Sequence, residues 1–143
     1  MARTYRLTPL RRVANLLMRL LLRLGLAPRT TMLLTVPGRR SSTPRSTPVA
    51  LVEDAGQRWL VAPYGPVGWV HNARAAGQVE LSRGRRSETV RLHELAPEAA
   101  APILKAYVQQ VPITRPYFDV TPDAPLAAFA AEAPKHSVFR VVP

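Results

Sequence analysis

Three arginines and several hydroxyl-bearing side chains gather in residues 35–49, T-V-P-G-R-R-S-S-T-P-R-S-T-P-V, between two apolar runs. Arginine presents a planar fork of N–H donors that matches phosphate or carboxylate, and serine and threonine add neutral donors. No acidic residue in the stretch pairs with the arginines, and Pro37 with Gly38 indicates a turn. The pattern predicts an anion-binding turn, with a solvated arginine loop as the alternative. The donors are Arg39, Arg40, Ser41, Ser42, Thr43, Arg45, Ser46 and Thr47.

A second group of candidate binding residues follows the third expected strand. The loop Pro63-Tyr64-Gly65 leads from that strand to a short expected helix, whose first N–H groups can bind an anion or a carbonyl oxygen. On the helix, Trp69 can stack on a flat ring or fill the core. His71 and Asn72 stand beside it and can face a ligand. The competing interpretation is an ordinary loop followed by a core tryptophan.

Several kinds of active site are excluded by residue types that the sequence lacks or scatters. There is no cysteine, which rules out disulfides, thiolate zinc sites and cysteine nucleophiles. His71, His93 and His136 are widely spaced, so no metal site is expected. No G-x-G-x-x-G or Walker motif occurs, and no spacing indicates a nucleophile with a histidine and an acid. What remains is a set of binding groups.

The net charge of +11 is concentrated in the first third of the chain. Residues 1–52 contain ten arginines and no acid, whereas ten Lys and Arg meet nine Asp and Glu in residues 53–143. A membrane lipid, a nucleic acid or an acidic cofactor could match such a surface. Nucleic acid is the least supported partner, because the arginines are not interleaved with exposed aromatic residues.

Residues 10–26 predict an amphipathic helix. Leucines and small apolar residues fall on one face, and Arg12, Asn15, Arg19 and Arg23 fall on the other. A membrane-spanning helix or a signal peptide is not expected, because Arg19 and Arg23 interrupt the apolar run. Two interpretations stay open: the helix lies on an anionic membrane, or its leucine face packs on its own domain or on a second subunit. Gly25 and Pro28 predict the end of the helix.

The remaining elements predict an α+β fold. Expected strands are residues 30–36, 47–53, 57–62, 78–83, 88–94 and 137–142, and expected helices are residues 68–76, 97–110 and 122–133. Because hairpins join most of the strands, a mainly antiparallel sheet or a small, partly open barrel is indicated. We divide the 143 residues into a basic helix, 1–29, and one domain, 30–143.

Three segments carry a family resemblance: residues 33–49, then W-L-V-A-P-Y-G at 59–65, then G-W-V-H-N-A-R-A-A-G at 68–77. In this order and at these spacings they resemble the deazaflavin-dependent nitroreductase family, whose members bind coenzyme F-420 on a split β-barrel. The resemblance runs from Met32 to the C-terminus. It implies a split β-barrel of the FMN-binding type, mainly antiparallel, with helices at its periphery.

The resemblance also implies roles for individual residues. Arg39, Arg40, Ser41 and Arg45 would hold the cofactor phosphate, and Ser46, Thr47, Pro48 and Val49 would line the next strand. The backbone of Pro63, Tyr64 and Gly65 would meet the deazaflavin ring, and Trp69, His71 and Asn72 would close the site. Tyr64 and Tyr117 are the catalytic candidates. Ser42 departs from the family, which more often has glycine there; a positive φ would cost serine about 1 kcal/mol.

The implied reaction is hydride transfer from reduced coenzyme F-420 to an electron-poor acceptor, quinone-like or nitro-like. Because a cofactor supplies such chemistry itself, the absence of an acid–base constellation agrees with an enzyme. The alternatives are an FMN-dependent split-barrel reductase and a non-catalytic module that binds cofactor or lipid. The implied setting is the cytoplasm, with peripheral attachment to the inner face of the plasma membrane and pairing as a homodimer as further hypotheses.

Overall fold

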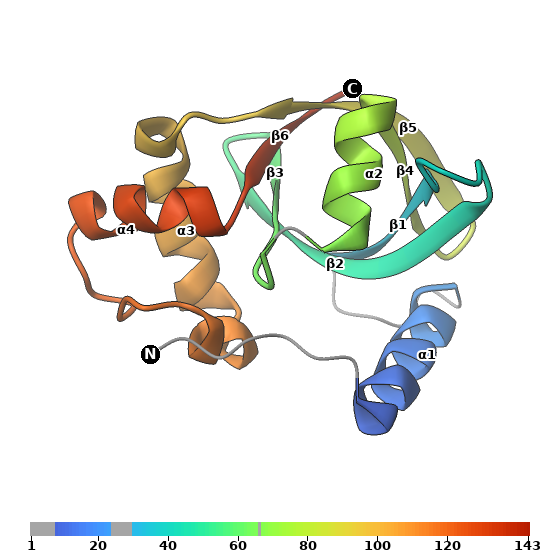
Figure 1. The fold of residues 1–143 in the computed structure, drawn as a ribbon, viewed down its shortest axis with the longest axis horizontal. Helices are drawn as coiled ribbons and strands as arrows, with labels where there is room; N and C mark the ends of the chain where they lie inside the picture. Colours follow the sequence, from blue (N-terminus) through green and yellow to red (C-terminus); the bar gives the residue numbers. More distant parts are fainter. Residues whose placement is uncertain (1–7, 24–29, 66) are drawn as a thin grey trace.

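The computed structural model describes residues 8–23, 30–65 and 67–143 (Figure 1). Two parts of the sequence-based predictions therefore lie outside the described residues. One is the expected helix end at Gly25 and Pro28, and the other is the position of the side chains of Arg19 and Arg23.

Six antiparallel strands of the described residues close into a barrel in the order β1-β2-β3-β6-β5-β4. The strands are β1 Thr31–Pro37, β2 Pro44–Asp54, β3 Gln57–Val61, β4 Gln78–Arg83, β5 Arg86–Glu94 and β6 Val138–Val142. The helices are α1 Pro9–Arg23, α2 Gly68–Ala76, α3 Pro97–Gln110 and α4 Leu126–Glu132, with the 3-10 turns η1 Pro112–Tyr117 and η2 Ala133–Lys135. The predicted antiparallel α+β barrel is confirmed.

The β1–β2 hairpin carries the arginine-rich turn. Its register pairs Thr35 with Ser46 and Val36 with Arg45. The hydroxyls of Thr35 and Ser46 are hydrogen-bonded across the pair at 2.8 Å. Strand β2 begins at Pro44, three residues before the predicted start at 47, because proline needs no N–H partner at the first position of a strand. Arg45 is therefore a strand residue with a defined direction.

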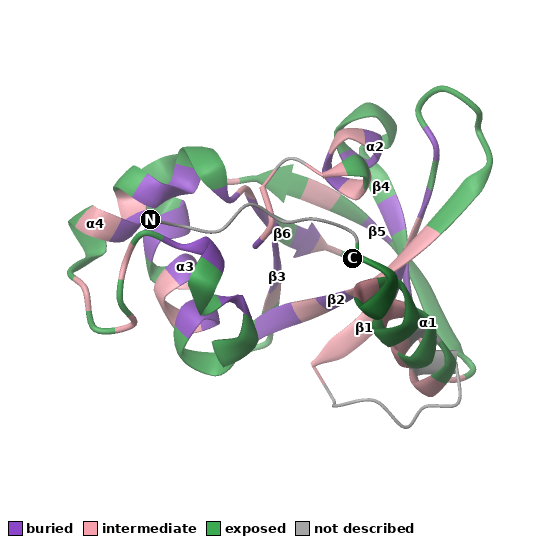
Figure 2. Ribbon diagram, turned by 60° about the horizontal axis from the view of Figure 1, so that its bottom comes forward, coloured by how far each residue is buried: buried purple, intermediate pink, exposed green. Residues whose placement is uncertain are grey.

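Two apolar clusters fix the barrel and the helices beside it. The first fills the barrel and includes Leu34, Leu60 and Leu81, each with no exposed surface. Helix α2 lies across the barrel opening and adds Val70 and Ala73 to this cluster (Figure 1). The second cluster lies outside the barrel, where α3 packs on β2, β3 and β6 and α4 packs on α3, around Phe129 and Leu104 (Figure 2).

Helix α3 has the predicted bounds, whereas the helix that follows it is shorter than predicted. Helix α4 is confined to Leu126–Glu132, within the expected 122–133. Pro125 disfavours helical backbone at the preceding residue, so the helix begins after it. The 3-10 turn η1 was not predicted from the sequence. Its two prolines, Pro112 and Pro116, are residues that disfavour a regular helix.

Helix α1 leaves most of its leucine face exposed and contacts the barrel through only a few side chains. Met18 and Leu21 pack on Leu33 of β1, whereas Leu10, Val13 and Leu17 are 79%, 64% and 56% exposed. Of the alternatives left open by the sequence, packing of the leucine face on its own domain is wrong for these three residues and confirmed for Leu21. Contact with a membrane or with a second subunit stays a prediction. Leucines occupy more of the helix circumference than one narrow contact can cover. Among the described residues, no helix is long and apolar enough to cross a membrane.

Candidate functional site

A cavity of about 450 Å³ lies between the outer face of the barrel, α1 and the α3–η1 corner. Strand β2 supplies one wall with residues 45–50, and the loop after β3 supplies Pro63 and Tyr64. Helix α2 contributes Trp69 and Asn72. The lining is mainly apolar, as is usual for sites that bind a flat organic ligand.

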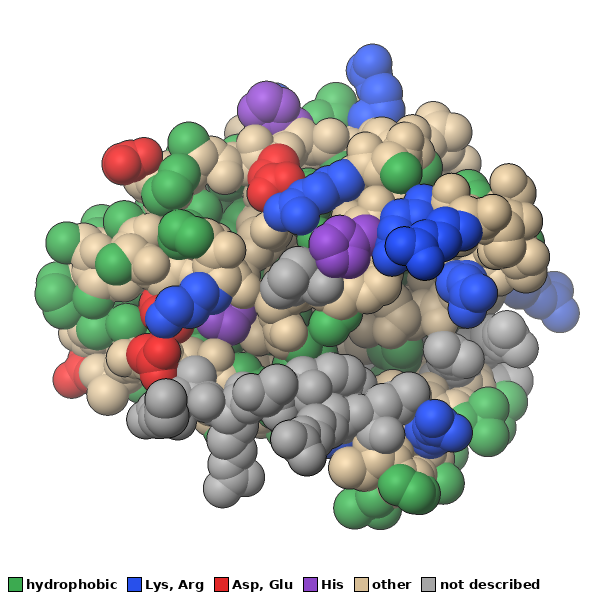
Figure 3. Space-filling view, viewed as in Figure 1, with side chains coloured by type: hydrophobic (Ala, Val, Ile, Leu, Met, Phe, Trp, Pro, Cys, Tyr) green, Lys and Arg blue, Asp and Glu red, His purple; other side chains and the backbone are tan. Residues whose placement is uncertain are grey.

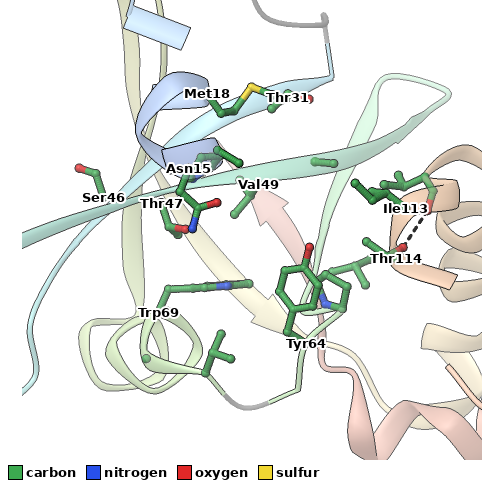
Figure 4. A pocket seen from close by; sticks show the side chains of 18 of the residues that line it. Asn15, Met18, Thr31, Ser46, Thr47, Val49, Tyr64, Trp69, Ile113 and Thr114 are labelled. Atoms are coloured by element: carbon green, nitrogen blue, oxygen red, sulfur yellow. Dashed lines mark hydrogen bonds between the residues drawn. The ribbon is translucent and has the colours of Figure 1, made fainter. Parts of the chain in front are cut away.

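The side chains at the centre of this cavity come from three separate parts of the chain. In Figure 4, the Tyr64 hydroxyl and the Trp69 ring point inward from below, and Asn15 of α1 points toward them from above. Trp69 also packs against Phe139, with ring centroids 6.0 Å apart, so it serves the core and the cavity together. The core role expected for Trp69 is therefore confirmed, and its stacking on a flat ligand stays a prediction.

A second, basic cavity of about 330 Å³ adjoins the first. It is lined by Gly38, Arg39, Arg40, Ser41, Arg45, Gly68 and Asn72. Arg45, Gly68 and Asn72 line both cavities, so the apolar and basic compartments meet at these three residues. Figure 3 shows Lys and Arg side chains gathered beside α2, where the end of the β1–β2 hairpin lies.

Asn72 fixes the basic turn against α2. Its side chain is buried, and Oδ1 accepts hydrogen bonds from the backbone N–H of Arg39 at 3.1 Å and from Arg39 Nη1 at 2.9 Å. A buried amide needs such partners, and Arg39 gains a defined orientation in return. The basic cavity is thus lined by the guanidinium groups of Arg39, Arg40 and Arg45 and by the hydroxyl of Ser41. This set of donors suits a phosphate.

The turn itself requires unusual backbone. A Cβ on Gly38 would lie 2.8 Å from Ser41 Oγ and 3.2 Å from Arg45 Nε, so a side chain there would displace two of the donors. Ser42 has φ of 59° and donates its N–H to the Gly38 carbonyl at 2.8 Å. The condition stated for Ser42 from the sequence, a positive φ, therefore holds. Serine occupies a conformation that glycine adopts at lower cost.

Not every residue expected at the site lines a cavity. Of the sequence-derived set, residues 45–49, Pro63, Tyr64, Trp69 and Asn72 line the larger cavity, and Arg39, Arg40 and Ser41 line the smaller. Gly65 and His71 line neither. Successive helix residues are rotated by about 100°, so Trp69 and Asn72 share a face of α2 that His71 cannot join.

Tyr117 stands behind the cavity. It is buried, and its ring meets that of Tyr64 edge-on, with centroids 4.9 Å apart. The guanidinium of Arg11 donates to the Tyr117 hydroxyl and lies over the ring, with Cζ 5.3 Å from its centroid. Tyr117 thus supports Tyr64 and joins η1 to α1.

Several lining residues were missed from the sequence. Asn15 and Met18 come from α1, and Tyr107, Ile113 and Thr114 come from α3 and η1. No local motif marks them, since each reaches the cavity only through tertiary packing. Burial raises the pKa of Tyr107, and nearby Tyr64 raises it further, so the Tyr107 phenol stays protonated. No group of three or more possible metal ligands occurs in the described residues.

A model of the family described as F420H(2)-dependent quinone reductase matches residues 10–122. The chain belongs to this quinone reductase family. Membership confirms the resemblance that three sequence segments indicated, and it identifies an oxidoreductase of the coenzyme F-420-dependent kind. No match was found among curated proteins.

Solved structures share the fold of this quinone reductase family member. A reductase dependent on reduced coenzyme F-420 is 23% identical, with a TM-score of 0.54 over 79% of this chain and 94% of that one. A chain described as a domain-swapped dimer is 24% identical, with a TM-score of 0.59 over 94% and 99%. A Listeria innocua protein, proposed to be a pyridoxamine 5′-phosphate oxidase, is 13% identical, with a TM-score of 0.53 over 80% and 84%. These likenesses confirm the split-barrel fold.

Proposed function

We propose that this protein transfers a hydride from reduced coenzyme F-420 to a quinone-like acceptor bound in the same cavity. The observation that carries the proposal is the adjacency of the apolar cavity and the basic one, which share Arg45, Gly68 and Asn72 in their linings. A deazaflavin cofactor has the matching form, because a flat ring continues into a chain that bears a phosphate.

The basic compartment suits the phosphate of the cofactor. Arg39, Arg40 and Arg45 offer guanidinium donors, and Ser41 adds a hydroxyl. Charge-assisted hydrogen bonds from arginine are about twice as strong as neutral ones, and a bidentate pair also fixes orientation. Because Asn72 holds Arg39 before any ligand binds, little ordering of that side chain remains to be paid on binding.

The apolar compartment suits the ring. Pro63, Tyr64 and Trp69 form one end of it, and Pro48 and Val49 of β2 form a wall. These side chains would exclude water and orient the ring, and the acceptor would lie beside it in the same cavity. When bound, the cofactor supplies the hydride. A para-quinone that receives this hydride and one proton from solvent becomes a hydroquinone, which balances the two-electron reaction. Nitro-like acceptors are a second class for the same cavity.

The phosphate assignment is tested by titrating the protein with oxidised coenzyme F-420 and following cofactor fluorescence. We expect the Arg39→Ala/Arg45→Ala variant to bind at least tenfold more weakly, as the loss of two charge-assisted contacts requires. The matched control is Arg85→Ala/Arg86→Ala, which removes the same charge at the exposed β4–β5 turn. Equal affinity of the two double variants would refute the assignment, and no binding by the unmodified protein would refute the function.

FMN is the second cofactor candidate, favoured by the barrel that this chain shares with the Listeria innocua protein. A panel of coenzyme F-420, FMN, FAD and haem, titrated under one set of conditions, separates the two. A yellow protein that retains FMN through purification would favour FMN. Selective binding of the deazaflavin would favour the function proposed here.

We also propose that α1 attaches the enzyme to the anionic inner face of the plasma membrane, so that lipophilic acceptors are reached from the cytoplasm. Figure 3 shows hydrophobic and basic side chains on the surface of α1, and Leu10, Val13, Leu16, Leu17 and Leu20 are more than half exposed. Such a helix binds anionic lipid through both features. The test is sedimentation with anionic and neutral vesicles. Leu10→Asp/Leu17→Asp should abolish binding, and unchanged binding would contradict the proposal.

Pairing as a homodimer is a separate proposal, supported by the similar chain described as a domain-swapped dimer. Analytical ultracentrifugation across a range of protein concentrations measures it directly. A monomer at every concentration would exclude a stable pair.

A further inference from the structure

Helix α1 is held at both ends over the cavity. Near its C-terminal end, Met18 and Leu21 pack on the buried Leu33 of β1. Near its N-terminal end, Arg11 donates to the hydroxyl of Tyr117 in η1, on the opposite side of the cavity. The helix therefore spans from the barrel to the α3–η1 corner. A side chain on its inner face between these two contacts has a defined position above the cavity.

Asn15 is that side chain. It is half-buried and lines the cavity, and Figure 4 shows it pointing toward Tyr64 and Trp69. The neighbouring lining residues of α1, Ala14 and Met18, carry no hydrogen-bonding groups. Within the described residues, the structure assigns no hydrogen bond to the Asn15 amide. An amide in partly dry surroundings gains free energy when a partner completes its hydrogen bonds, so the position favours a polar ligand atom.

We propose that the Asn15 side-chain NH2 donates a hydrogen bond to an oxygen of the hydride acceptor, and so selects acceptors that carry a carbonyl oxygen. This inference rests on the proposed function, which places the cofactor ring against Pro63 and Tyr64. An acceptor lying above that ring lies between it and Asn15. As a quinone accepts a hydride, negative charge grows on its oxygen, and a fixed donor in an apolar cavity stabilises that charge better than water does.

A neutral donor suits this task better than an arginine would. The amide offers two N–H donors and carries no charge that an apolar cavity would have to bury. It favours an uncharged acceptor with an oxygen at the ring edge. A phenazinium dye also accepts a hydride, but it has no oxygen for Asn15 to contact. The two acceptors together therefore separate recognition of the oxygen from the general state of the site.

The experiment compares the unmodified enzyme with Asn15→Leu, Asn15→Asp and Asn15→Gln. Leucine and aspartate keep the branched shape and the number of side-chain heavy atoms of asparagine. Leucine has no polar group, and aspartate has no N–H donor. We expect both to lower kcat/KM for a para-quinone about tenfold, since loss of one hydrogen bond corresponds to about a tenfold effect. Asn15→Leu should change kcat/KM for the dye less than twofold, and Asn15→Asp should not lower it, because a carboxylate attracts the cationic dye. Asn15→Gln keeps the donors and should recover part of the quinone activity. The matched control, Gln57→Leu, removes an exposed amide at the distant β2–β3 turn.

A binding measurement tests the same contact without turnover. Calorimetric titration of the para-quinone into protein saturated with oxidised coenzyme F-420 should show about tenfold weaker quinone binding for Asn15→Leu. The affinity for the oxidised cofactor should stay within twofold. Equal losses for quinone and dye, or no loss for either, would overturn the assignment of Asn15 while leaving the proposed function intact. An unmodified protein that neither binds the cofactor nor reduces either acceptor would overturn both.

Discussion

Asn72 Oδ1 accepts two hydrogen bonds from one residue, Arg39, through its backbone N–H at 3.1 Å and its guanidinium Nη1 at 2.9 Å. One buried amide on α2 thus sets both the path of the β1–β2 turn and the direction of an arginine side chain. The same amide lines both cavities, so the position of the proposed phosphate site relative to the ring site depends on it.

The first prediction concerns Asn72 itself. Asn72→Ala removes the acceptor of the Arg39 N–H and Nη1, and the loss of a part-buried hydrogen bond costs about 0.5–1.5 kcal/mol of unfolding free energy. We expect a loss of that size in urea denaturation, together with weaker cofactor binding. Asn72→Asp is the matched control, because it keeps the acceptor oxygen. Its added charge should repel the phosphate, so we expect stability near that of the unmodified protein and weaker binding. Full cofactor affinity in both variants would contradict the role of Asn72.

The second prediction uses the strained residue of the turn. Ser42 has φ of 59°, a conformation that costs a side chain about 1 kcal/mol. Ser42→Gly removes that strain but also frees the unfolded chain, so we expect a net gain of about 0.5 kcal/mol or less. Ser42→Ala keeps the Cβ and should give no gain. Thermal unfolding of the three proteins decides the point, and a gain for alanine equal to that for glycine would be inconsistent with backbone strain.

The third prediction concerns the space at Gly38. An added Cβ would lie 2.8 Å from Ser41 Oγ, and side chains rather than backbone would have to move first. We therefore expect Gly38→Ala to change the unfolding free energy by less than about 1 kcal/mol. Cofactor affinity should nevertheless fall several-fold, because Ser41 and Arg45 are displaced from the proposed phosphate site. Fluorescence titration and denaturation on the same sample test both parts, and unchanged affinity would contradict the prediction.

The fourth prediction is a pH dependence of stability that comes from His136. The His136 ring is buried and stacks on the Phe118 ring, with the two ring centroids 3.9 Å apart. Its Nδ1 lies 3.3 Å from the carbonyl oxygen of Ala62, just before the Pro63 loop. Burial lowers the pKa of His136, and Lys135 lowers it further, whereas Glu132 and the Ala62 and Pro63 backbone oppose the change. The folded protein therefore binds fewer protons at His136 than the unfolded chain does.

The contribution of neutral His136 to the free energy of unfolding should then be fully present above the usual histidine pKa of about 6.5. It should be lost as the pH falls below that value. The measurement is Tm between pH 7.5 and 5. His136→Gln should show a flatter pH dependence, and His93→Gln, at an exposed position of β5, should retain the original one. Identical slopes in all three proteins would exclude His136 as the source.

Much of the fold follows from local chemistry that the sequence displays. Two-residue turns, Ala55-Gly56 and Gly84-Arg85, join the strands of two hairpins, and apolar residues alternate with polar ones along β4, where Val79 and Leu81 are buried. Helix α2 begins at Gly68 and ends at Ala76, as predicted, because Gly77 adopts a left-handed C-cap. Trp69 and Asn72 were expected at the site from the family resemblance, and their three-residue spacing on α2 places both on the face that lines the cavity.

Only the tertiary structure decided which distant residues complete the site. Asn15, Ile113 and Thr114 are separated from the arginine turn by tens of residues, and no motif connects them to it. Their positions depend on how α1 and η1 close over β2, which rests on contacts such as Arg11 with Tyr117 and Met18 with Leu33.

The face that α1 presents was decided in the same way. Turns and caps are determined by hydrogen bonds within a few residues, so their signals stand in the sequence. A helix with apolar residues around most of its circumference can satisfy the hydrophobic effect in several orientations. The choice among them depends on the surface it meets, which exists only once the barrel has closed.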